Sequence, residues 1–357
     1  MKIALVGEFS SLHRYLKEGL EEIGEEVLFA SNGDGFKAIK GEDIQFPVLE
    51  KSRSLIHRYH YSNELGHFIK QIQNFDVVQI ASTNMFSVLD NSRVIRFIKG
   101  HNKRLSLVSA GSDYAFFRAY KTGKYQYHPF NYFPPNMYYK GIKGLLERRT
   151  ANQVEEMSDI IIPSLYDYVI GFDTPKLHEV IPFPINTERI EFEDNVITNK
   201  IVFFHGLNRE IKKGTPLIRE AMERLRDKYP NDVEIVIDGH MPFDKYIELM
   251  KRVNVVIDQT YGYGYGINSC LALAQGKIVA NPCKEEQIRI MNAEYNPFIT
   301  IYPSVDDIYQ KLCEILERKT ELQDMAIKGR QFVERYHNYI DVSQKYLDAW
   351  KSTMIDY

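Results

Sequence analysis

The chain has 357 residues, of which 44% are hydrophobic, and this is enough for two domains with sizeable cores. A formal charge of −3 and an isoelectric point near 6.4 give no broad basic field, and no nucleic-acid-binding module is recognisable, so we expect no nucleic-acid partner. Cys270, Cys283 and Cys313 have neither a metal-binding spacing nor the even count of a disulfide framework, which predicts reduced thiols and a cytoplasmic location.

The chain begins MKIALVGEF, which indicates a first strand rather than a signal peptide, and no apolar run is long enough to span a bilayer. Short β-branched runs then alternate with helical patterns, which predicts an α/β protein with parallel sheets flanked by helices. The predicted strands are Lys2–Val6, Glu26–Ala30, Asp76–Ala81, Arg104–Ala110, Asp159–Pro163, Glu179–Phe183, Ile201–Gly206, Val233–Asp238, Asn254–Gln259, Lys277–Asn281 and Phe298–Tyr302.

Two Rossmann-like halves emerge from this pattern. The stretch Pro182–Lys200 contains two prolines and an acidic run, which is typical of a linker. We therefore expect one Rossmann-like domain over residues 1–185, a second over 186–335, and a final helical segment over 336–357. An apolar stripe recurs in the final segment at helical spacing and predicts packing rather than binding: Tyr339, Val342, Tyr346 and Trp350.

The first strand ends at Gly7-Glu8-Phe9-Ser10-Ser11, just before an amphipathic helix. Ser10 or Ser11 is expected to cap this helix. GEFSSL lacks the later glycines of G-x-G-x-x-G, which disfavours NAD chemistry. Gly7 either lets a substrate approach the backbone closely or simply makes a tight turn.

The second half opens with FFHGLNREIKKG, which places Arg209 and Lys213 between a strand ending at Gly206 and a helix. Arginine offers a planar fork and lysine a compact charge, so both can stabilise a leaving diphosphate. The alternative is an ordinary solvated helix start. His205 closes an apolar strand, which favours a structural role.

Further along, IDQTYGYGYGINSCLALAQGKIVANP places three alternate glycines, Gly262, Gly264 and Gly266, before a helix that runs to about Gln275. A strand, a glycine loop and a helix form a phosphate-site arrangement, because glycine permits close approach and the first helical amides carry partial positive charge. The best-suited anion is a diphosphate. The residues predicted to contact the ligand are Gly7, Gly206, Tyr263, Gly264, Tyr265, Gly266, Ile267 and Asn268. The alternative is a flexible loop with its tyrosines packed outside it.

Residues 114–149 combine many aromatics with seven Lys and Arg against one Glu. Aromatic rings stack on sugars or lie at membrane interfaces, and cations favour anionic lipid or a pyrophosphate-linked acceptor. We expect an acceptor-side or peripheral membrane surface here. The alternative is an irregular loop whose tyrosines pack on the first domain.

The glycine run resembles the signature of retaining glycosyltransferases of the two-domain B type, family four, in which Glu-Gly-Phe-Gly opens a helix that ends Glu-Ala-Met-Ala-x-Gly-Lys-Pro-Val-Val-Ala. Two positions depart from it, because Tyr263 and Leu271 stand where the family has glutamates. The segment around Ile181 and Pro182 resembles the family's Ile-Pro-Asn-Gly-Val-Asp. The positions on the signature pattern are Gly264, Gly266, Ala272, Ala274, Gly276, Lys277, Val279 and Ala280.

The resemblance implies further site residues. Arg209 and Lys213 match the family's Gly-Arg-Leu followed by Lys-Gly if one residue is inserted. Asp113 closes SAGSD where related transferases read His-Gly-Ser-Asp, which implies a contact to the sugar or acceptor, while Ala110 replaces the histidine. An aspartate after glycine also initiates turns. The family further implies that residues 1–185 form the acceptor-side domain and that residues 186–335 bind the nucleotide sugar. It also implies that the last helix, within 336–357, crosses back onto the first domain.

The sequence thus predicts a glycosyltransferase that moves a sugar from a nucleotide diphosphate donor to a hydroxyl acceptor, a glycan or a lipid-linked one, in the interdomain cleft. The resemblance implies retention of configuration, no metal and no cofactor, with Arg209, Lys213 and Asp113 as catalytic residues. Bacterial surface-polysaccharide assembly is the expected setting. A nucleotide-sugar epimerase on the same fold remains an alternative, and so does a carbohydrate-binding pseudoenzyme, because Ala110, Tyr263 and Leu271 replace family residues.

Overall fold

The computed structural model describes residues 1–34, 39–49, 55–86, 88, 90–111, 113–133, 141–207, 209–239 and 243–354. The chain divides into two compact units. The first comprises Met1–Lys124, Pro134–Pro184 and Tyr339–Tyr357, and the second comprises Tyr125–Phe133 and Ile185–Asn338. Both contain a parallel sheet flanked by helices, which confirms the expected α/β class.

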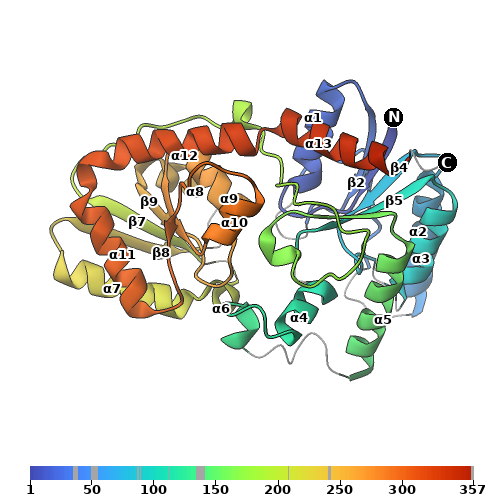
Figure 1. The fold of residues 1–357 in the computed structure, drawn as a ribbon, viewed down its shortest axis with the longest axis horizontal. Coiled ribbons are helices and arrows are strands. Elements are labelled where there is room, and N and C mark those ends of the chain that lie inside the picture. The colour runs from blue at the N-terminus through green and yellow to red at the C-terminus, as the bar shows by residue number, and fades with distance from the viewer. Residues whose placement is uncertain are drawn as a thin grey trace. The chain divides into compact units, whose positions relative to one another are not determined.

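The first unit is built on a parallel sheet of six strands in the order β3-β2-β1-β4-β5-β6 (Figure 1). Its elements are β1 (Lys2–Val6), α1 (Leu12–Glu22), β2 (Glu26–Ser31), β3 (Ile44–Gln45), α2 (Leu55–Gln71), β4 (Val77–Ile80), α3 (Asn91–Gly100), β5 (Arg104–Ser109), α4 (Tyr114–Lys121), α5 (Gly141–Met157), β6 (Ile160–Pro163), the 3₁₀ turn η4 (Tyr166–Tyr168) and α13 (Tyr339–Ser352).

Both faces of this sheet are buried, as the continuous apolar run of β1 requires. Successive side chains of a strand point to opposite faces, so Ala4 and Val6 join one core and Ile3 and Leu5 join the other. Residues of α2, α3 and α5 complete the first core, and residues of α1 and α13 complete the second.

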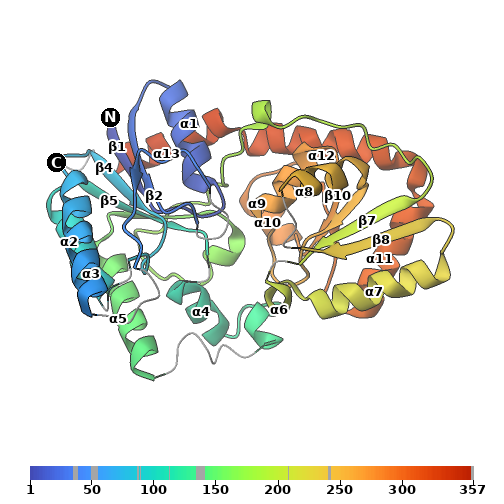
Figure 2. The same cartoon turned by 180° about the vertical axis from the view of Figure 1, so that it is seen from behind.

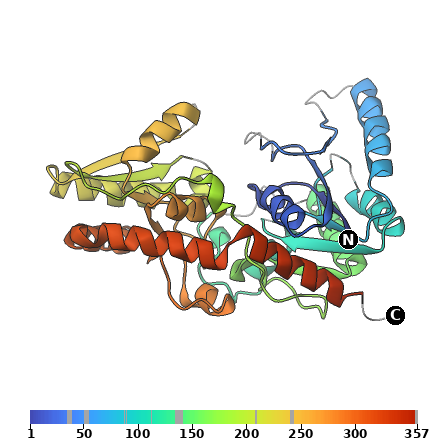
Figure 3. The same ribbon diagram turned by 90° about the horizontal axis from the view of Figure 1, so that it is seen from above.

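Helix α13 lies beside α1, although the two are far apart in the sequence (Figures 1 and 3). Gly19 allows this approach, because a Cβ there would lie 2.2 Å from the carbonyl oxygen of Tyr339. The stripe expected to pack is buried throughout: Tyr339, Val342, Tyr346 and Trp350. The prediction that the last helix crosses back onto the first domain is therefore confirmed.

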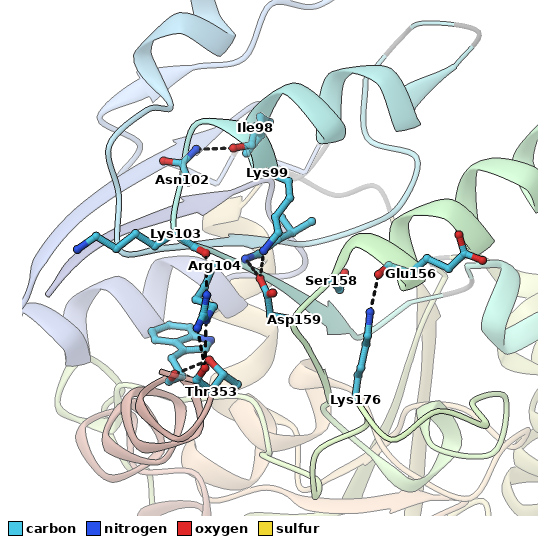
Figure 4. A network of polar contacts seen from close by, with 12 residues as sticks. Ile98, Lys99, Asn102, Lys103, Arg104, Glu156, Ser158, Asp159, Lys176 and Thr353 are labelled. Carbon is cyan, nitrogen blue, oxygen red and sulfur yellow. Dashed lines mark hydrogen bonds and ion pairs between the residues drawn. The ribbon is translucent and has the colours of Figure 1, made fainter. Parts of the chain in front are cut away.

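The end of α13 is also fixed to the edge of the sheet by polar contacts (Figure 4). The guanidinium of Arg104 donates two hydrogen bonds, of 3.1 and 2.9 Å, to the carbonyl oxygen of Thr353. On the neighbouring strand, Asp159 accepts from the amide of Leu105 and pairs with Lys99. These contacts connect β5, β6 and the C-terminal helix.

The second unit has a parallel sheet of five strands in the order β11-β10-β9-β7-β8 (Figure 2). Its elements are η2 (Pro129–Asn131), η5 (Thr187–Arg189), β7 (Ile201–Gly206), α6 (Glu210–Lys213), α7 (Thr215–Lys228), β8 (Val233–Asp238), α8 (Phe243–Arg252), β9 (Val255–Ile257), α9 (Ile267–Ala274), β10 (Ile278–Asn281), α10 (Glu285–Ile290), β11 (Ile299–Thr300), α11 (Val305–Glu317), η6 (Lys319–Glu321) and α12 (Leu322–Tyr336). Residues of α7, α11 and α12 cover one face and residues of α8 the other.

Three features differ from the sequence prediction. Glu179–Phe183 is not a strand, and Pro182 has no N–H for a ladder, although Ile181 still donates to the carbonyl of Pro163. The two-residue strand β3 was missed. The stretch Tyr125–Phe133, expected within the first domain, folds with the second unit instead.

Candidate functional site

The second unit has a topological switch point between β7 and β9. From β7 the chain first adds β8 on one side and then adds β9, β10 and β11 on the other. In open parallel sheets, ligands bind outside the carboxyl ends of the strands at such a point. Gly206 ends β7, and Arg209 and Lys213 lie at the two ends of the short helix α6 that follows it. The loop after β9 carries Asp258 and the glycine run. The fold therefore brings these two predicted segments together.

Lys213 forms an ion pair with Asp258, and its ammonium nitrogen lies 2.8 Å from Asp258 Oδ1. The side chains are 14% and 6% exposed. Ser269 Oγ donates to Asp258 Oδ2 over 2.9 Å, and the Thr260 amide donates to the Lys213 carbonyl over 2.9 Å. Burial alone would raise the pKa of Asp258, but the charge of Lys213 and the two side-chain hydrogen bonds hold it below its usual value. The lysine is thus fixed at the carboxyl edge of the sheet.

Arg209 begins helix α6 in a left-handed conformation, with φ 58° and ψ 49°. A residue with a Cβ adopts this conformation at a cost of about 1 kcal/mol. Its side chain is exposed, and no ion pair to it is found within the described ranges. Gly214, with φ 77°, ends α6 where a Cβ would lie 2.3 Å from Thr260 Cγ2. Of the two predicted site cations in this segment, Arg209 is thus exposed and Lys213 is fixed.

His205 has the structural role that its position favours. Its Nδ1 lies 2.7 Å from the carbonyl oxygen of Ile257, and its Nε2 lies 2.8 Å from Thr215 Oγ1. Burial lowers the pKa of His205 to about 4, so the ring is neutral at pH 7. The histidine joins β7, β9 and α7 rather than offering an acid or base.

The glycine run opens α9 as expected, with Gly266 as its N-cap residue. A Cβ on Gly266 would lie 3.6 Å from Asp258 Oδ2, so the start of the helix adjoins the Lys213 pair. Asn268 in the first turn is exposed, and Ile267 is buried. The amides at this helix start and the Lys213 ammonium therefore lie at the same edge, which suits an anion.

The two predicted tyrosines do not present their rings at this edge. Tyr265 is 1% exposed, its hydroxyl lies 2.8 Å from His337 Nε2, and its ring packs on Phe298. The Tyr263 ring lies 5.1 and 5.6 Å from the rings of Tyr125 and Tyr127. The Gly262 amide also donates to the Tyr127 carbonyl. Both tyrosine side chains therefore pack against other aromatic residues, as the alternative interpretation of the sequence expected. Their backbone remains beside Gly264 and Gly266.

The first unit has its own switch point, between β1 and β4, where Gly7 lies. Gly7 has φ 91°, and a Cβ there would lie 2.9 Å from Ala81 Cβ, so a tight turn requires this glycine. The expected serine cap is wrong, because Ser11 is left-handed and makes no side-chain cap bond. Glu8 replaces it by accepting the amides of Phe9, His13 and Arg14 over 2.6, 3.2 and 3.0 Å.

The Glu8 carboxyl has an unusual pKa. Burial raises it to about 7, although the three amide hydrogen bonds act in the opposite direction. The sequence signal for this role was an acidic residue just before an amphipathic helix. Sequence reasoning passed over it in favour of the two serines.

This pKa predicts a pH-dependent stability that Glu8→Gln should remove. Between about pH 4.5 and 7 the folded state keeps a proton that the unfolded state releases, so rising pH destabilises the wild type by up to about 3 kcal/mol. As the pH rises from about 4.5 to 7, the free energy of unfolding of Glu8→Gln should therefore increase relative to that of the wild type. Urea unfolding at a series of pH values measures it, and a constant difference would contradict the assignment.

Asp113 begins helix α4 and accepts the amide of Phe116 over 3.0 Å, so it has the turn-forming role that the sequence also allowed. Burial raises the pKa of Asp113 to about 6, with a further contribution from Glu155, while Arg118 acts in the opposite direction. Arg118 pairs with Glu155 at 3.0 Å. A carboxyl with a pKa near neutrality can exchange a proton during a reaction.

Other features lie away from these residues. A hollow of about 470 Å³ lies where β3 leads into its loop beside α2, lined by Gln45, Phe46, Pro47, Val48, Glu64, His67, Phe68 and Gln71. In the ranges that the structure describes, no three His, Cys, Asp or Glu side chains gather as a metal site would need. None of the described helices combines the length and the apolar content needed to cross a membrane.

Comparison with known proteins finds no matching family model and no matching curated sequence. Solved structures do match over the whole chain. Sucrose-phosphate synthase from Thermosynechococcus elongatus has a TM-score of 0.65 at 11% identity and covers 100% of both chains. Anabaena Alr3699/HepE in complex with UDP and glucose has a TM-score of 0.62 at 11% identity, over 99% of this chain and 100% of that one.

UDP-GlcNAc 2-epimerase from Neisseria meningitidis, bound to UDP-GlcNAc, has a TM-score of 0.54 at 12% identity, over 99% of this chain and 100% of that one. At such low identity these matches establish the fold alone. They confirm the two-domain α/β fold that the sequence predicted.

Proposed function

We propose that the chain is a glycosyltransferase that moves a sugar from a nucleotide diphosphate sugar to a hydroxyl acceptor. The observation that carries this proposal is Lys213, which is fixed by Asp258 beside the start of α9 at the switch point of the second unit, with the exposed Arg209 at the other end of the short helix α6. A diphosphate leaving group develops negative charge as its bond to the sugar breaks, and fixed cations stabilise that charge. The fold shared with proteins solved with UDP or UDP-GlcNAc supports the same ligand class.

The two cations have different roles in this proposal. An ammonium group has three N–H donors, and the bond from Lys213 to Asp258 uses one, so the others can bind a phosphate oxygen. Arg209 is exposed and can turn its guanidinium fork onto the same diphosphate. The amides near Ile267 and Asn268 complete the anion site, and Gly206 and Gly264 leave room for the ligand.

The proposed reaction needs no protein nucleophile. The bond between the sugar carbon and the phosphate oxygen breaks, the diphosphate takes the electron pair, and the acceptor oxygen bonds to the same carbon. With retention of configuration, the departing diphosphate receives the acceptor's proton. Asp113, with a pKa near 6, is the protein group proposed to contact the acceptor or sugar. Arg209 and Lys213 supply the positive charge that a metal ion supplies in other transferases.

A peripheral membrane contact is proposed through the start of α5, in the basic stretch 114–149. Ile142 is 80% exposed and Leu145 is 65% exposed, three residues apart, and Arg148 and Arg149 in the next turn are also exposed. Apolar side chains beside arginines suit an anionic lipid surface. A lipid-linked acceptor of bacterial surface-polysaccharide assembly would be presented at such a surface.

Vesicle flotation tests the membrane contact. Wild-type protein should float with vesicles that contain phosphatidylglycerol more than with phosphatidylcholine vesicles. Ile142→Ser with Leu145→Ser should reduce the bound fraction severalfold, since each buried apolar side chain contributes about 1.5–3 kcal/mol. Equal flotation with both vesicle types would rule out the anionic surface.

Product analysis separates transfer from the two alternatives. A nucleotide-sugar epimerase converts the donor without any acceptor, and its fold is represented by the Neisseria meningitidis enzyme. A binding protein forms no product, and the replaced family positions Ala110, Tyr263 and Leu271 favour it. Incubation of nucleotide sugars with and without hydroxyl acceptors should release nucleoside diphosphate faster with one acceptor. Conversion without acceptor would establish the epimerase instead.

A further inference from the structure

Lys284 is a second lysine that contacts the glycine run. It follows β10 and is the N-cap residue of α10. Although lysine is rarely buried, this residue is only 6% exposed. Its ammonium donates to the carbonyl oxygen of Gly262 over 3.0 Å and to that of Pro282 over 3.1 Å. The side chain thus binds the backbone of the glycine run directly.

Three tyrosine rings surround the same ammonium, and we refer to Tyr127, Tyr263 and Tyr302 as the tyrosine cage. The Lys284 nitrogen lies 4.4, 5.2 and 4.6 Å from their respective ring centres. A cation this close to aromatic rings is attracted by their π electrons, and the attraction grows when water is excluded. The cage therefore holds a charge that burial would otherwise disfavour.

Tyr127 reaches this cage from a distant part of the sequence. It belongs to Tyr125–Phe133, which we call the strap because it lies outside the second unit's main stretch of sequence and yet folds with it. The strap's Tyr127 carbonyl accepts the Gly262 amide over 2.9 Å. Its Tyr132 ring stacks on Tyr261 at 4.4 Å with an interplanar angle of 16°. Two adjacent residues of the loop after β9, Tyr261 and Gly262, therefore contact the strap.

Gly262 is consequently held at both of its backbone polar groups, since its amide binds the strap and its carbonyl binds Lys284. The Lys284 amide also donates to the Tyr263 carbonyl over 3.0 Å. A loop with alternate glycines loses more conformational entropy than other loops when it is fixed. Contacts that fix it beforehand remove that cost from ligand binding.

We propose that Lys284 is a positioning residue that orders the glycine loop, residues 262–266, for binding of the nucleotide diphosphate. This inference rests on the proposed function and adds to it a residue that acts through the loop. Lys284 directs its charge at carbonyl oxygens and rings, whereas Arg209 and Lys213 are the proposed phosphate ligands. Its loss should weaken donor binding more than it slows turnover at saturating donor.

The test compares Lys284→Met with Lys251→Met. Methionine keeps most of the lysine volume and removes the charge, and Lys251 is an exposed lysine on α8 that pairs only with Glu248 in the described ranges. In ligand-free protein, hydrogen exchange at residues 261–266 should be at least about tenfold faster in Lys284→Met, since a desolvated cation–π contact is a tenfold effect or more. Lys251→Met should match the wild type.

A second readout is the affinity for whichever of UDP, GDP, dTDP and ADP the wild type binds most tightly. Lys284→Met should raise the dissociation constant and the KM for the donor about tenfold or more while kcat changes less than threefold. Lys284→Arg, which keeps the charge, should recover part of the affinity. Unchanged exchange in Lys284→Met, or faster exchange with unchanged affinity, would overturn the positioning role. If the wild type binds none of the four, the proposed function itself fails, which is a distinguishable result.

Discussion

We expect Arg209→Gln and Lys213→Met, made together, to lower glycosyl transfer by at least about 10³-fold, because one preorganised charge-stabilising donor contributes about 10²–10³-fold. Arg209→Gln alone should lower turnover about 10²-fold without loss of stability, since Arg209 is exposed. Initial rates of nucleoside diphosphate release at saturating donor and acceptor measure both effects.

Lys213 cannot be substituted alone without affecting stability, because it neutralises a buried carboxylate. Asp258 is 6% exposed and pairs with Lys213, so Lys213→Met alone would leave a buried carboxylate without its cation and cost about 3–5 kcal/mol. The Lys213→Met change should therefore carry Asp258→Asn, so that lost activity is not confused with unfolding. Lys212→Met is the matched control in the same short helix and should retain turnover. If the combined variant stays folded and keeps turnover within about tenfold of wild type, the two cations are not catalytic.

The second large effect is on stability. Trp350→Ala should lower the free energy of unfolding of the first unit by about 3–5 kcal/mol, because a large aromatic side chain in a packed core leaves a cavity. Trp350 is fully buried on α13 among residues of α1 and β1. Urea unfolding followed by far-ultraviolet circular dichroism measures the change. Trp350 is the single tryptophan, so its emission in the wild type reports burial independently.

A polar chain adds to this effect. Trp350 Nε1 donates to Ser106 Oγ over 3.1 Å, and Ser106 Oγ donates to Gln79 Oε1 over 3.0 Å. Gln79 Nε2 lies 3.1 Å from His13 Nε2, and His13 Nδ1 lies 2.7 Å from the Gly7 carbonyl oxygen. Burial lowers the pKa of His13 to about 4, so the ring is neutral and can donate at Nδ1 while accepting at Nε2.

Trp350→Phe keeps most of the ring volume but removes the donor, and we expect it to cost about 1–2 kcal/mol. Nucleotide binding by the second unit should be retained in both variants. A loss below about 1 kcal/mol in Trp350→Ala, or solvent-exposed emission from the wild type, would show that α13 is not docked on the first unit.

The alternation of strands and helices could be predicted from the sequence because each element has a local signal. Ile3–Val6 is a continuous apolar run after a charged lysine, and the apolar stripe from Tyr339 to Trp350 has helical spacing. Two residues that match the family signature, Gly276 and Lys277, are explained by packing. A Cβ on Gly276 would lie 2.1 Å from the Glu193 carbonyl oxygen, and Lys277 pairs with Glu193 at 2.9 Å, so these two positions serve packing.

The strap and its partners could not be predicted, because they depend on contacts between distant segments. More than a hundred residues separate Tyr127 from Tyr263, and helix α9 and strand β10 lie between Tyr263 and Lys284. No sequence periodicity relates these three residues. The ion pair between Lys213 and Asp258 could not be predicted for the same reason, since the sequence places Asp258 near the end of a predicted strand. Glu8 was missed because two serines offered a more common cap.

A thermal-shift panel of UDP, GDP, dTDP, CMP and ADP with the purified full chain tests whether the second unit binds a nucleotide diphosphate. We expect one nucleoside diphosphate to stabilise the protein by about 2.7 kcal/mol at a hundred times its dissociation constant. This shift should be lost in the variant with Arg209→Gln, Lys213→Met and Asp258→Asn. If no nucleotide at millimolar concentration gives a shift, or if that variant gives an equal one, the second unit has no such diphosphate site.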